Sequence, residues 1–465
     1  MNKPNILIIL ADQLRRQALG CYGNPDVQTP NIDRLAQSGV QFNAACSTNP
    51  VCVPFRFTFM TGQYSHTRQV PAIDWRMSPA ERTLADEFND AGYESIYIGK
   101  WHLFGGMGEG AFKTPVPREH QGRWQKWLGF ELRNNHYDTV VFEDDDPTPI
   151  TLDKHQTDGL TDLTLDYLEK RDCDKPFACV LSIEAPHDPR QTAEPYGSRW
   201  SDKEITLPLN FFRACDDLDT DVSRSWSLPY KEEDRDWVVA DFRRYHAMVE
   251  QLDDNVGRIL DWLEASGEAE HTTLILVSDH GDNLGSHCLR GKQYPFEESI
   301  GIPLLIRGPE IPAGVKICDP VSTEDLFPTF LGLAGITPRD TLPGMNLVPV
   351  IRDMKMSLER PGVMLEFVRE NRSGVSFHSR EYRAFRSQRY LYSVLGLAGG
   401  MKPWQFFDLE NDPYQLNNLV NDTAYEEQLS KHHQWLRERM VKTGDHAWLT
   451  AAWGVAELNP WPMID

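Results

Sequence analysis

The stretch Asn5-Ile6-Leu7-Ile8-Ile9-Leu10-Ala11, with Asp12 directly after it, decides the fold class. It is a continuous apolar run of strand length, which is the pattern of a strand buried on both faces of a parallel sheet. Similar runs recur at residues 95–99, 177–183, 273–278 and 303–307, with helical patterns between them at 83–91, 157–170 and 241–266. This alternation predicts an α/β fold, an open, mostly parallel sheet flanked by helices, with its ligands at the carboxyl ends of the strands.

The pattern changes towards the C-terminus. Residues 315–351 predict one more helix and a loop, and residues 189–236 predict a long irregular insertion. Beyond about residue 370, alternating runs at 381–386, 389–393 and 405–408 predict antiparallel strands, and 424–441 predict a charged helix. Because 465 residues exceed one ordinary domain, we expect a large α/β domain over residues 1–370 and a small antiparallel-sheet and helix domain over 371–465.

Composition narrows the class of partner. The formal net charge of −22 repels nucleic acid and anionic membranes, so we expect neither as a partner. The eight cysteines form no CxxC pair and no regular spacing, so free thiols are expected rather than a zinc site or a disulfide framework. The apolar run at residues 6–11 is too short to span a bilayer and lacks the features of a secretory signal. We therefore expect a cytoplasmic protein, or a periplasmic or secreted one if a signal has been removed.

Aspartates follow two of the predicted strands. Asp12-Gln13 ends the first strand, and Asp279-His280 follows the run at residues 273–278. Each aspartate alone also fits a helix N-cap. Because parallel strands present their ends side by side, the two aspartates together can converge on one hard cation.

A further polar group, Gly99-Lys100-Trp101-His102, follows the run at residues 95–99. Lys100 and His102 are two residues apart, so on an extended segment both side chains leave the same face. A cation and a proton-transfer group on one face suit a single anionic centre. A surface lysine and a packed histidine are the alternative interpretation.

The segment Cys52-Val53-Pro54-Phe55-Arg56 runs into a helix-like segment that closes on Thr61-Gly62. Together with the motifs above, with Glu184-Ala185-Pro186-His187 and with Lys292 in Arg290-Gly291-Lys292-Gln293, it resembles the type I sulfatases of the alkaline phosphatase superfamily. The phrase Phe407-Asp-Leu-Glu-Asn-Asp-Pro413 is also similar to the end of sulfatases. The resemblance covers nearly the whole chain in the family's order, and it implies an alkaline phosphatase-like sheet.

In that family the cysteine is oxidised to formylglycine, so the resemblance implies a formylglycine-generating enzyme as a maturation partner. Mature residue 52 would then be an aldehyde whose hydrate is the nucleophile. The resemblance also implies one divalent metal, held by Asp12, Gln13, residue 52, Asp279 and His280. Calcium, which favours oxygen ligands, is the first expectation, and the imidazole makes manganese the second.

The resemblance further implies hydrolysis of a sulfate ester to an alcohol and inorganic sulfate. Arg56, Lys100 and Lys292, with the metal, would neutralise the charge of the sulfate oxygens. His187 is the expected general acid for the departing alcohol, and His102 helps to deprotonate the hydrate for the release of sulfate. Lys100, His187 and Lys292 are therefore the expected substrate contacts. The substrate is a small-molecule or glycan sulfate ester, with a carbohydrate sulfate first by family frequency.

Two alternatives stay open. Many sulfatases have aspartate and asparagine where this chain has Gln13 and His280, and its form also resembles choline sulfatases and phosphonate monoester hydrolases. Hydrolysis of phosphonate or phosphate esters is therefore the closest alternative, and a non-catalytic binder of sulfated glycans is the second. Phe55 stands where the family usually has a small residue. We expect maturation still to occur because the Cys-x-Pro-x-Arg element is kept.

Weaker candidates surround these motifs. His66, Arg68, Arg76 and His287 could line the substrate pocket, with loop packing as the equal alternative. We expect specificity to lie in the loops at residues 105–146 and 189–236.

Overall fold

The computed structural model describes residues 3–445 except 71, 74, 106–112, 173, 214–228, 354–355, 369–370, 373–374, 377–380 and 398–399. Cys173, Cys215 and parts of the two loops expected to set specificity therefore lie outside the described residues. The six cysteines within the described ranges are free thiols, as the sequence predicts.

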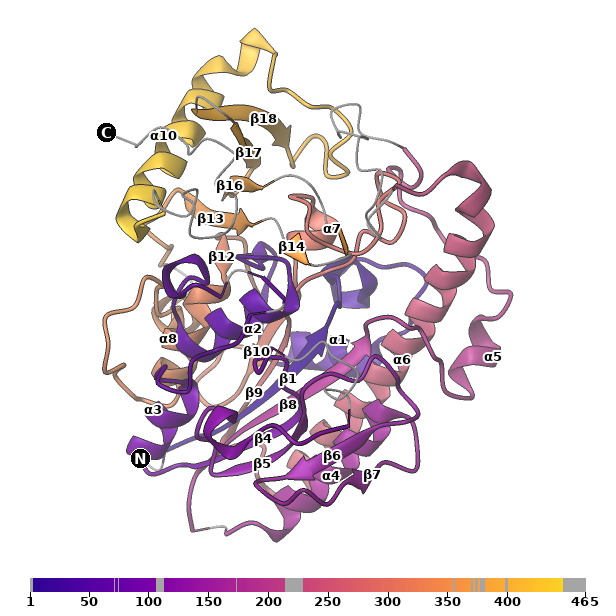
Figure 1. The fold of residues 1–465 in the computed structure, drawn as a ribbon, viewed down its shortest axis with the longest axis vertical. Coiled ribbons are helices and arrows are strands. Elements are labelled where there is room, and N and C mark those ends of the chain that lie inside the picture. The colour runs from indigo at the N-terminus through magenta and orange to yellow at the C-terminus, as the bar shows by residue number, and fades with distance from the viewer. Residues whose placement is uncertain are drawn as a thin grey trace.

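A ten-stranded mixed sheet forms the centre of the larger part of the molecule (Figure 1). Its order is β11-β2-β10-β9-β1-β8-β4-β5-β6-β7. The opening apolar stretch is β1 (Asn5–Asp12), which lies parallel between β8 (Phe177–Pro186) and β9 (Thr272–Ser278). β4 (Glu94–Lys100) and β5 (Lys126–Phe130) continue the parallel part beyond β8. The prediction of an α/β fold with a parallel central sheet is confirmed.

The edges of the sheet depart from the parallel pattern. β10 (Leu304–Arg307) runs antiparallel to both β9 and β2 (Val40–Phe42). β11 (Val315–Ile317), at the same edge as β2 and β10, pairs parallel with β2. At the other edge, β6 (Val140–Glu143) is antiparallel to both β5 and β7 (Ile150–Thr151). Five of the strands have two to five residues each and contain too few apolar residues to be recognised as buried runs, whereas β10 lies in the predicted run at 303–307. For this reason the sequence did not indicate β2, β5, β6, β7 or β11.

Alternate residues of β1 enter two separate apolar cores, one on each face of the sheet. Ile6 and Ile8 pack in the first core, and Leu7 and Ile9 pack in the second. The first face is covered by α2 (Cys52–Thr61), α3 (Leu84–Asp90) and α8 (Thr323–Leu333), and the second by α1 (Pro30–Gln37), α4 (Gln156–Lys170) and α6 (Arg235–Ala265). α6 begins at Arg235, before the predicted start at residue 241.

A four-stranded antiparallel sheet lies beyond the large sheet, at the top of Figure 1. Its strands, in spatial order, are β13 (Gly362–Phe367), β16 (Tyr382–Ser387), β17 (Tyr390–Leu397) and β18 (Gly400–Asp408). α10 (Glu426–Thr443) packs on one face, and the other face meets Cys46, Val51 and Ile300 of the larger part. The predicted small C-terminal sheet with a helix is confirmed. β13 was not indicated by the sequence, and the domain boundary at residue 370 stays a prediction.

The other elements are short. They are β3 (Ala45–Cys46), β12 (Val321–Ser322), β14 (Asn371–Arg372), β15 (Val375–Ser376), α5 (Tyr196–Trp200), α7 (Glu297–Ile300) and α9 (Val348–Arg352), with six 3-10 turns. α5 falls within the insertion that was expected to be irregular. Within the described ranges, we find no helix with the length and apolarity that crossing a membrane requires.

A buried ion-pair network joins the two sheets. Glu297 of α7 forms ion pairs with Arg16 and with Arg386 of β16, the latter at 3.2 Å. Burial alone would raise the pKa of Glu297, but the two guanidiniums outweigh it and lower the pKa to about 2. The carboxylate is therefore charged in the folded protein over the whole physiological pH range.

Glu297→Gln tests this junction. The change leaves two buried guanidiniums without their anion, so we expect unfolding at pH 7 to become about 3–5 kcal/mol easier, measured by urea denaturation. Because the folded-state pKa of about 2 lies below the ordinary 4.5, this stability is present above about pH 4.5 and lost as the pH falls towards 2. Glu310→Gln is the control, since Glu310 pairs with Arg352 on the surface and should cost about 1 kcal/mol or less. Equal losses in the two variants would contradict the prediction.

Candidate active site

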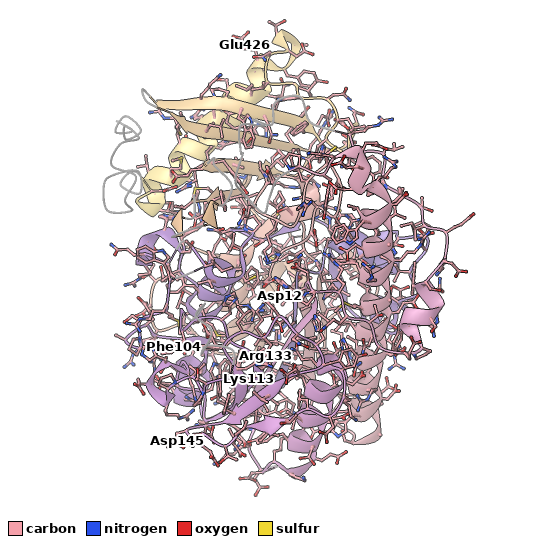
Figure 2. All side chains as sticks on the ribbon, turned by 45° about the vertical axis from the view of Figure 1, so that its right-hand side comes forward. Asp12, Phe104, Lys113, Arg133, Asp145 and Glu426 are labelled. Carbon is pink, nitrogen blue, oxygen red and sulfur yellow. The ribbon has the colours of Figure 1, made fainter. Side chains whose placement is uncertain are left out.

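Four neighbouring parallel strands have their carboxyl ends side by side, and a charged side chain lies at or next to the end of each strand. β1 ends in Asp12, and Asp279 directly follows β9. β4 ends in Lys100, and β8 carries Glu184 near its end. All four side chains are fully buried, and Figure 2 shows Asp12 near the middle of the molecule. The strand order thus gathers residues that are far apart in the sequence.

The two aspartates are not equally compensated. Asp12 Oδ2 lies 2.7 Å from Lys100 Nζ and accepts a hydrogen bond from Arg56 Nη2 at 3.0 Å. Burial alone would raise the pKa of Asp12, but Lys100 and Arg56 help to hold that pKa well below its ordinary value. Asp279 Oδ2 lies 3.5 Å from the same guanidinium, and burial and the charge of Asp12 raise the pKa of Asp279 to about 7. Asp279 is therefore the less compensated of the two carboxylates.

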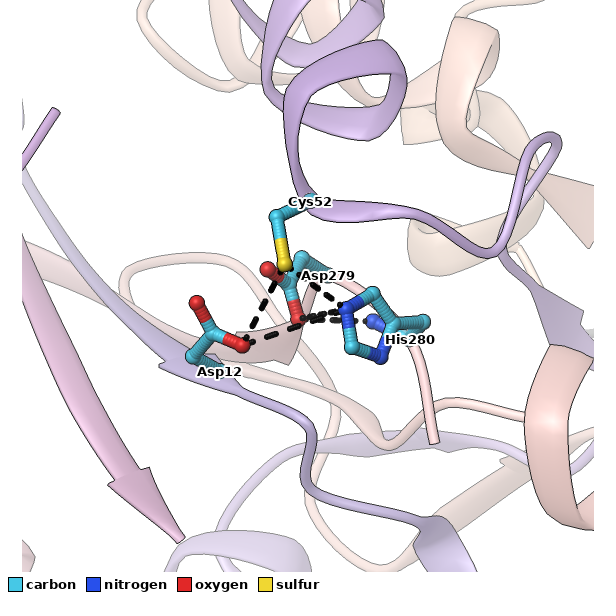
Figure 3. Close-up of side chains that lie close together, drawn as sticks. All are labelled: Asp12, Cys52, Asp279 and His280. Carbon is cyan, nitrogen blue, oxygen red and sulfur yellow. Dashed lines mark hydrogen bonds and ion pairs between the residues drawn. The ribbon is translucent and has the colours of Figure 1, made fainter. Parts of the chain in front are cut away.

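Cys52 is the first residue of α2, and its thiol points at this cluster (Figure 3). Its Sγ lies 3.7 Å from Asp12 Oδ1, 3.2 Å from His280 Nε2 and 3.2 Å from Lys292 Nζ. Burial and the Asp12 carboxylate raise the pKa of the thiol to about 12. Unmodified Cys52 is therefore a neutral thiol at pH 7 and no thiolate nucleophile.

Two consecutive residues of α2, Phe55 and Arg56, have different surroundings. Phe55 is buried in the apolar core, where its ring stacks on Phe59 with 6.0 Å between centroids. Arg56 instead reaches the strand ends, and its Nη1 donates hydrogen bonds to Lys100 O at 2.9 Å and to Ser182 Oγ at 2.8 Å. Phe55 thus packs beneath the site without blocking the guanidinium.

His280 faces the thiol with an unprotonated nitrogen. Its Nδ1 lies 2.9 Å from Gly281 O, and this contact assigns the ring proton to Nδ1. Burial, followed by the charge of Lys292, lowers the pKa of His280 well below its ordinary value, so the ring is neutral.

These side chains form a donor cluster. One donor atom from each of Asp12, Cys52, Asp279 and His280 lies within 4.8 Å of the others. Two carboxylates and an imidazole lone pair are ligands that divalent cations accept, and the incompletely compensated charge of Asp279 suits one as well. The residues present therefore fit a divalent metal.

Gln13, the fifth predicted ligand, is held beside the cluster. Its backbone is left-handed, with φ of 66°, and its N–H donates to Asp279 Oδ1 at 2.9 Å. The side-chain Oε1 accepts from Lys292 Nζ at 2.9 Å, and Nε2 donates to Asp282 Oδ2 at 2.6 Å. In this arrangement the amide oxygen faces Lys292, and the role of Gln13 as a metal ligand stays a prediction.

His187 and Lys292 contact each other, and Lys292 also contacts the Cys52 thiol. Lys292 Nζ lies 3.3 Å from His187 Nε2. His187 Nδ1 lies 2.6 Å from Asp188 O, which assigns the ring proton to Nδ1. Burial and the Lys292 ammonium lower the pKa of His187 to about 4. The imidazole is therefore neutral at pH 7, and its Nε2 lone pair faces Lys292.

Lys100 and His102 lie close together, but not for the predicted reason. β4 ends at Lys100 and His102 is left-handed, with φ of 56°, so the argument from an extended segment does not apply. Lys100 Nζ lies 3.3 Å from Glu184 Oε1 as well as near Asp12. Burial, followed by the Lys100 charge, lowers the pKa of His102 well below its ordinary value. Neither ring nitrogen of His102 has a hydrogen-bond partner among the described residues.

The weaker candidates have contacts elsewhere. His66 Nδ1 lies 2.5 Å from Glu366 Oε2 in a buried network, and His287 stacks on Phe296 with 3.9 Å between centroids. Arg68 and Arg76 are exposed. Pocket roles for these four stay predictions.

No sequence pattern assigned a role to Glu184, Arg190 or Asp282. Glu184 carried a signal, because it is a charged residue at the end of an apolar run and belongs to the same motif as His187. Arg190 forms ion pairs with both Asp241 and Asp282. Asp241 lies in α6, far along the chain, and no local pattern relates it to Arg190.

Comparison with known proteins agrees with this geometry. The model of the sulfatase family matches residues 4–336, and a model described as the C-terminal part of N-sulphoglucosamine sulphohydrolase matches residues 285–442. An ulvan-active sulfatase of Formosa agariphila is 31% identical over 95% of this chain and 82% of its own length. An N-acetylglucosamine-6-O-sulfatase of Bacteroides thetaiotaomicron is 26% identical over 96% of this chain and 87% of its own.

A solved structure shares the whole fold. The protein was solved in complex with its substrate D-glucosamine-2-N,6-O-disulfate, and it superposes on this chain with a TM-score of 0.83. The two are 24% identical, and the match covers 96% of this chain and 99% of the other. The match extends through both sheets. This chain therefore belongs to the sulfatase family and has its alkaline phosphatase-like fold.

Proposed function

We propose that this sulfatase hydrolyses a carbohydrate sulfate ester to an alcohol and inorganic sulfate. The observation that carries the proposal is the convergence of Asp12, His280 and Lys292 on the Cys52 sulfur, all within 3.7 Å of it. The sulfated substrate comes from the relatives, one of which is named as an N-acetylglucosamine-6-O-sulfatase.

Two groups would complete the site. Formylglycine at position 52, made by a formylglycine-generating enzyme, would supply a hydrated aldehyde as the nucleophile. A divalent cation held by Asp12, residue 52, Asp279 and His280 would supply positive charge beside it. Calcium is the first proposal because of the two carboxylates, and manganese is the second because of the imidazole.

Lys292 supplies the positive charge that remains for the substrate. Arg56 and Lys100 form ion pairs with buried carboxylates. Lys292 instead makes its hydrogen bonds to neutral groups, namely Gln13 Oε1, the Cys52 thiol and His187 Nε2. An ammonium held over the reacting atom by neutral partners is available to a sulfate oxygen, where it stabilises the developing charge.

His187 and His102 are positioned to move protons. His187 Nε2 is unprotonated and contacts an ammonium, so proton donation to the departing oxygen requires proton uptake at this atom. An anionic ester bound between the two raises the pKa of His187, because it adds negative charge where the lysine now lowers it. His102 is neutral, buried and without a hydrogen-bond partner among the described residues, which suits a base in the release of sulfate.

Two substrates separate this function from its alternatives. We expect the matured protein to hydrolyse 4-nitrophenyl sulfate with a higher kcat/KM than 4-nitrophenyl phenylphosphonate.

His187→Gln should lower kcat on a hexose sulfate by about 10²–10⁴-fold, and much less on 4-nitrophenyl sulfate, because nitrophenolate leaves without a proton. His432→Gln is the control, since His432 is buried between α10 and the small sheet.

Each alternative has its own outcome in this experiment. A preference for the phosphonate ester would contradict the sulfatase proposal and support a phosphonate hydrolase. Absence of turnover with either ester, when residue 52 has been converted, would support a non-catalytic binder of sulfated glycans. Equal losses of kcat on the hexose and aryl sulfates would contradict the role of His187.

Asp279→Asn tests the metal. Asp279 is a buried carboxylate whose charge Arg56 offsets only in part, so the variant without metal should be at least as stable as the wild type. Ca²⁺ or Mn²⁺ should raise the Tm of the wild type, and this rise should be lost or much reduced in Asp279→Asn. Asp253→Asn, a buried aspartate of α6, is the control and should keep the rise. An undiminished rise in Asp279→Asn would contradict the proposed ligand set.

A further inference from the structure

A pocket adjoins the catalytic cluster. It has a volume of about 420 Å³ and is shared between the catalytic loops and α6. Gln13, Asp188 and Gly291 line it from the catalytic side. Gln13 and Asp188 also contact Lys292 and His187, so the pocket begins where the catalytic residues end. Its volume is within the range of sites that hold a small ligand.

One face of α6 forms the opposite wall. Trp237, Asp241 and Arg244 follow one another at helical spacings of four and three residues, and all three line the pocket. Trp237 is 51% exposed, although large aromatic side chains are usually buried. The Arg244 side chain is 44% exposed, and its Nη1 lies 3.3 Å from Asp241 Oδ1.

Buried ion pairs fix this wall against the catalytic loops. Arg190 bridges Asp241 of α6 and Asp282 of the loop after β9. Asp282 in turn accepts the hydrogen bond from Gln13 Nε2 at 2.6 Å. All of these side chains are nearly inaccessible to solvent. The helix face is therefore held in a defined position relative to Lys292, as a specificity site requires.

The pocket offers two guanidiniums to a ligand. Arg290 lies two residues before Lys292, and its guanidinium stacks over the ring of Tyr230 at 4.4 Å. The Arg290 side chain is 37% exposed, and its Nη2 lies 4.0 Å from Asp234 Oδ2. The carboxylate of Asp241 is shared with Arg190, so it offsets Arg244 only in part. Both arginines can therefore form charge-assisted hydrogen bonds with an anionic group.

We propose that this pocket binds a second sugar ring of an anionic glycan, next to the ring that carries the scissile sulfate. The ring lies against Trp237, and its carboxylate or further sulfate binds Arg244 and Arg290. An apolar aromatic face and forked donors are the two features that a charged sugar needs. The inference depends on the proposed sulfatase function and narrows its substrate to an acidic oligosaccharide of at least two rings.

Binding to an inactive protein tests the subsite apart from catalysis. Cys52→Ala needs no maturation and turns over no substrate, so calorimetry with Ca²⁺ present can compare ligands directly. The probes are heparin-derived and chondroitin-derived disaccharides that carry a uronate and a sulfate, with glucosamine 6-sulfate as the single-ring reference. We expect at least one disaccharide to bind more tightly than the single ring.

Second-site variants locate the added affinity. Adding Trp237→Ala or Arg244→Gln to Cys52→Ala should weaken disaccharide binding by about tenfold or more, because a hydrogen bond to a charged group is lost in the case of Arg244. The affinity for glucosamine 6-sulfate should change much less. Arg258→Gln is the matched control, because Arg258 lies on the same helix with a 42% exposed, ion-paired side chain outside the pocket.

The outcomes separate the subsite from the sulfatase function. Disaccharides that bind no more tightly than the single ring, or equal losses in Arg244→Gln and Arg258→Gln, would overturn the subsite while aryl sulfate hydrolysis stands. Loss of affinity for the single ring in Trp237→Ala to the same extent as for the disaccharide would also overturn it. Failure of the matured wild type to hydrolyse any sulfate ester would overturn the sulfatase function itself.

Discussion

The site depends on two buried carboxylates, Asp12 and Asp279, that lie side by side at the ends of β1 and β9. Removing a charge from water costs several kcal/mol unless partners compensate it. Arg56 of α2 and Lys100 of β4 reach this point and form ion pairs with the aspartates. The compensation therefore also fixes the positions of α2 and β4, and with α2 the thiol of Cys52 comes to lie over the cluster (Figure 3).

The same electrostatics explain why the site suits one cation and one anion at different positions. Asp279 remains under-compensated, which favours a cation between it and Asp12. Lys292 makes its hydrogen bonds to neutral groups and so favours an anion on the other side of residue 52. A metal and a sulfate ester can therefore lie on different sides of residue 52. The long α6 extends the charge arrangement outwards, since its Asp241 is tied through Arg190 to the loop that carries Asp282.

Much of this arrangement could be predicted from the sequence, and the rest had physical reasons to remain hidden. Apolar runs identified β1, β4, β8 and β9 because strands buried on both faces are apolar throughout. The short strands β2, β5, β6, β7 and β11 had too few apolar residues to give such a signal. Asp12, Asp279 and His280 were found because they follow apolar runs, whereas Cys52 and Lys292 were found through motifs that resemble those of the sulfatases. Arg190 and Asp241 were not found because their pairing depends on how α6 packs against the sheet. The predicted geometry of Lys100 and His102 was wrong because β4 ends at Lys100 and the backbone of His102 is left-handed rather than extended.

The central claim is that residue 52, buried as a neutral thiol beside the donor atoms of Asp12, Asp279 and His280, is the precursor of the nucleophile. Peptide mass spectrometry of the tryptic fragment 35–56 tests it most directly, with protein made in the native host or together with a formylglycine-generating enzyme. This fragment contains Cys46 and Cys52, so Cys46 serves as an internal reference. We predict that residue 52 alone is converted to the lighter aldehyde. A fragment in which both residues remain cysteine under these conditions would contradict the account.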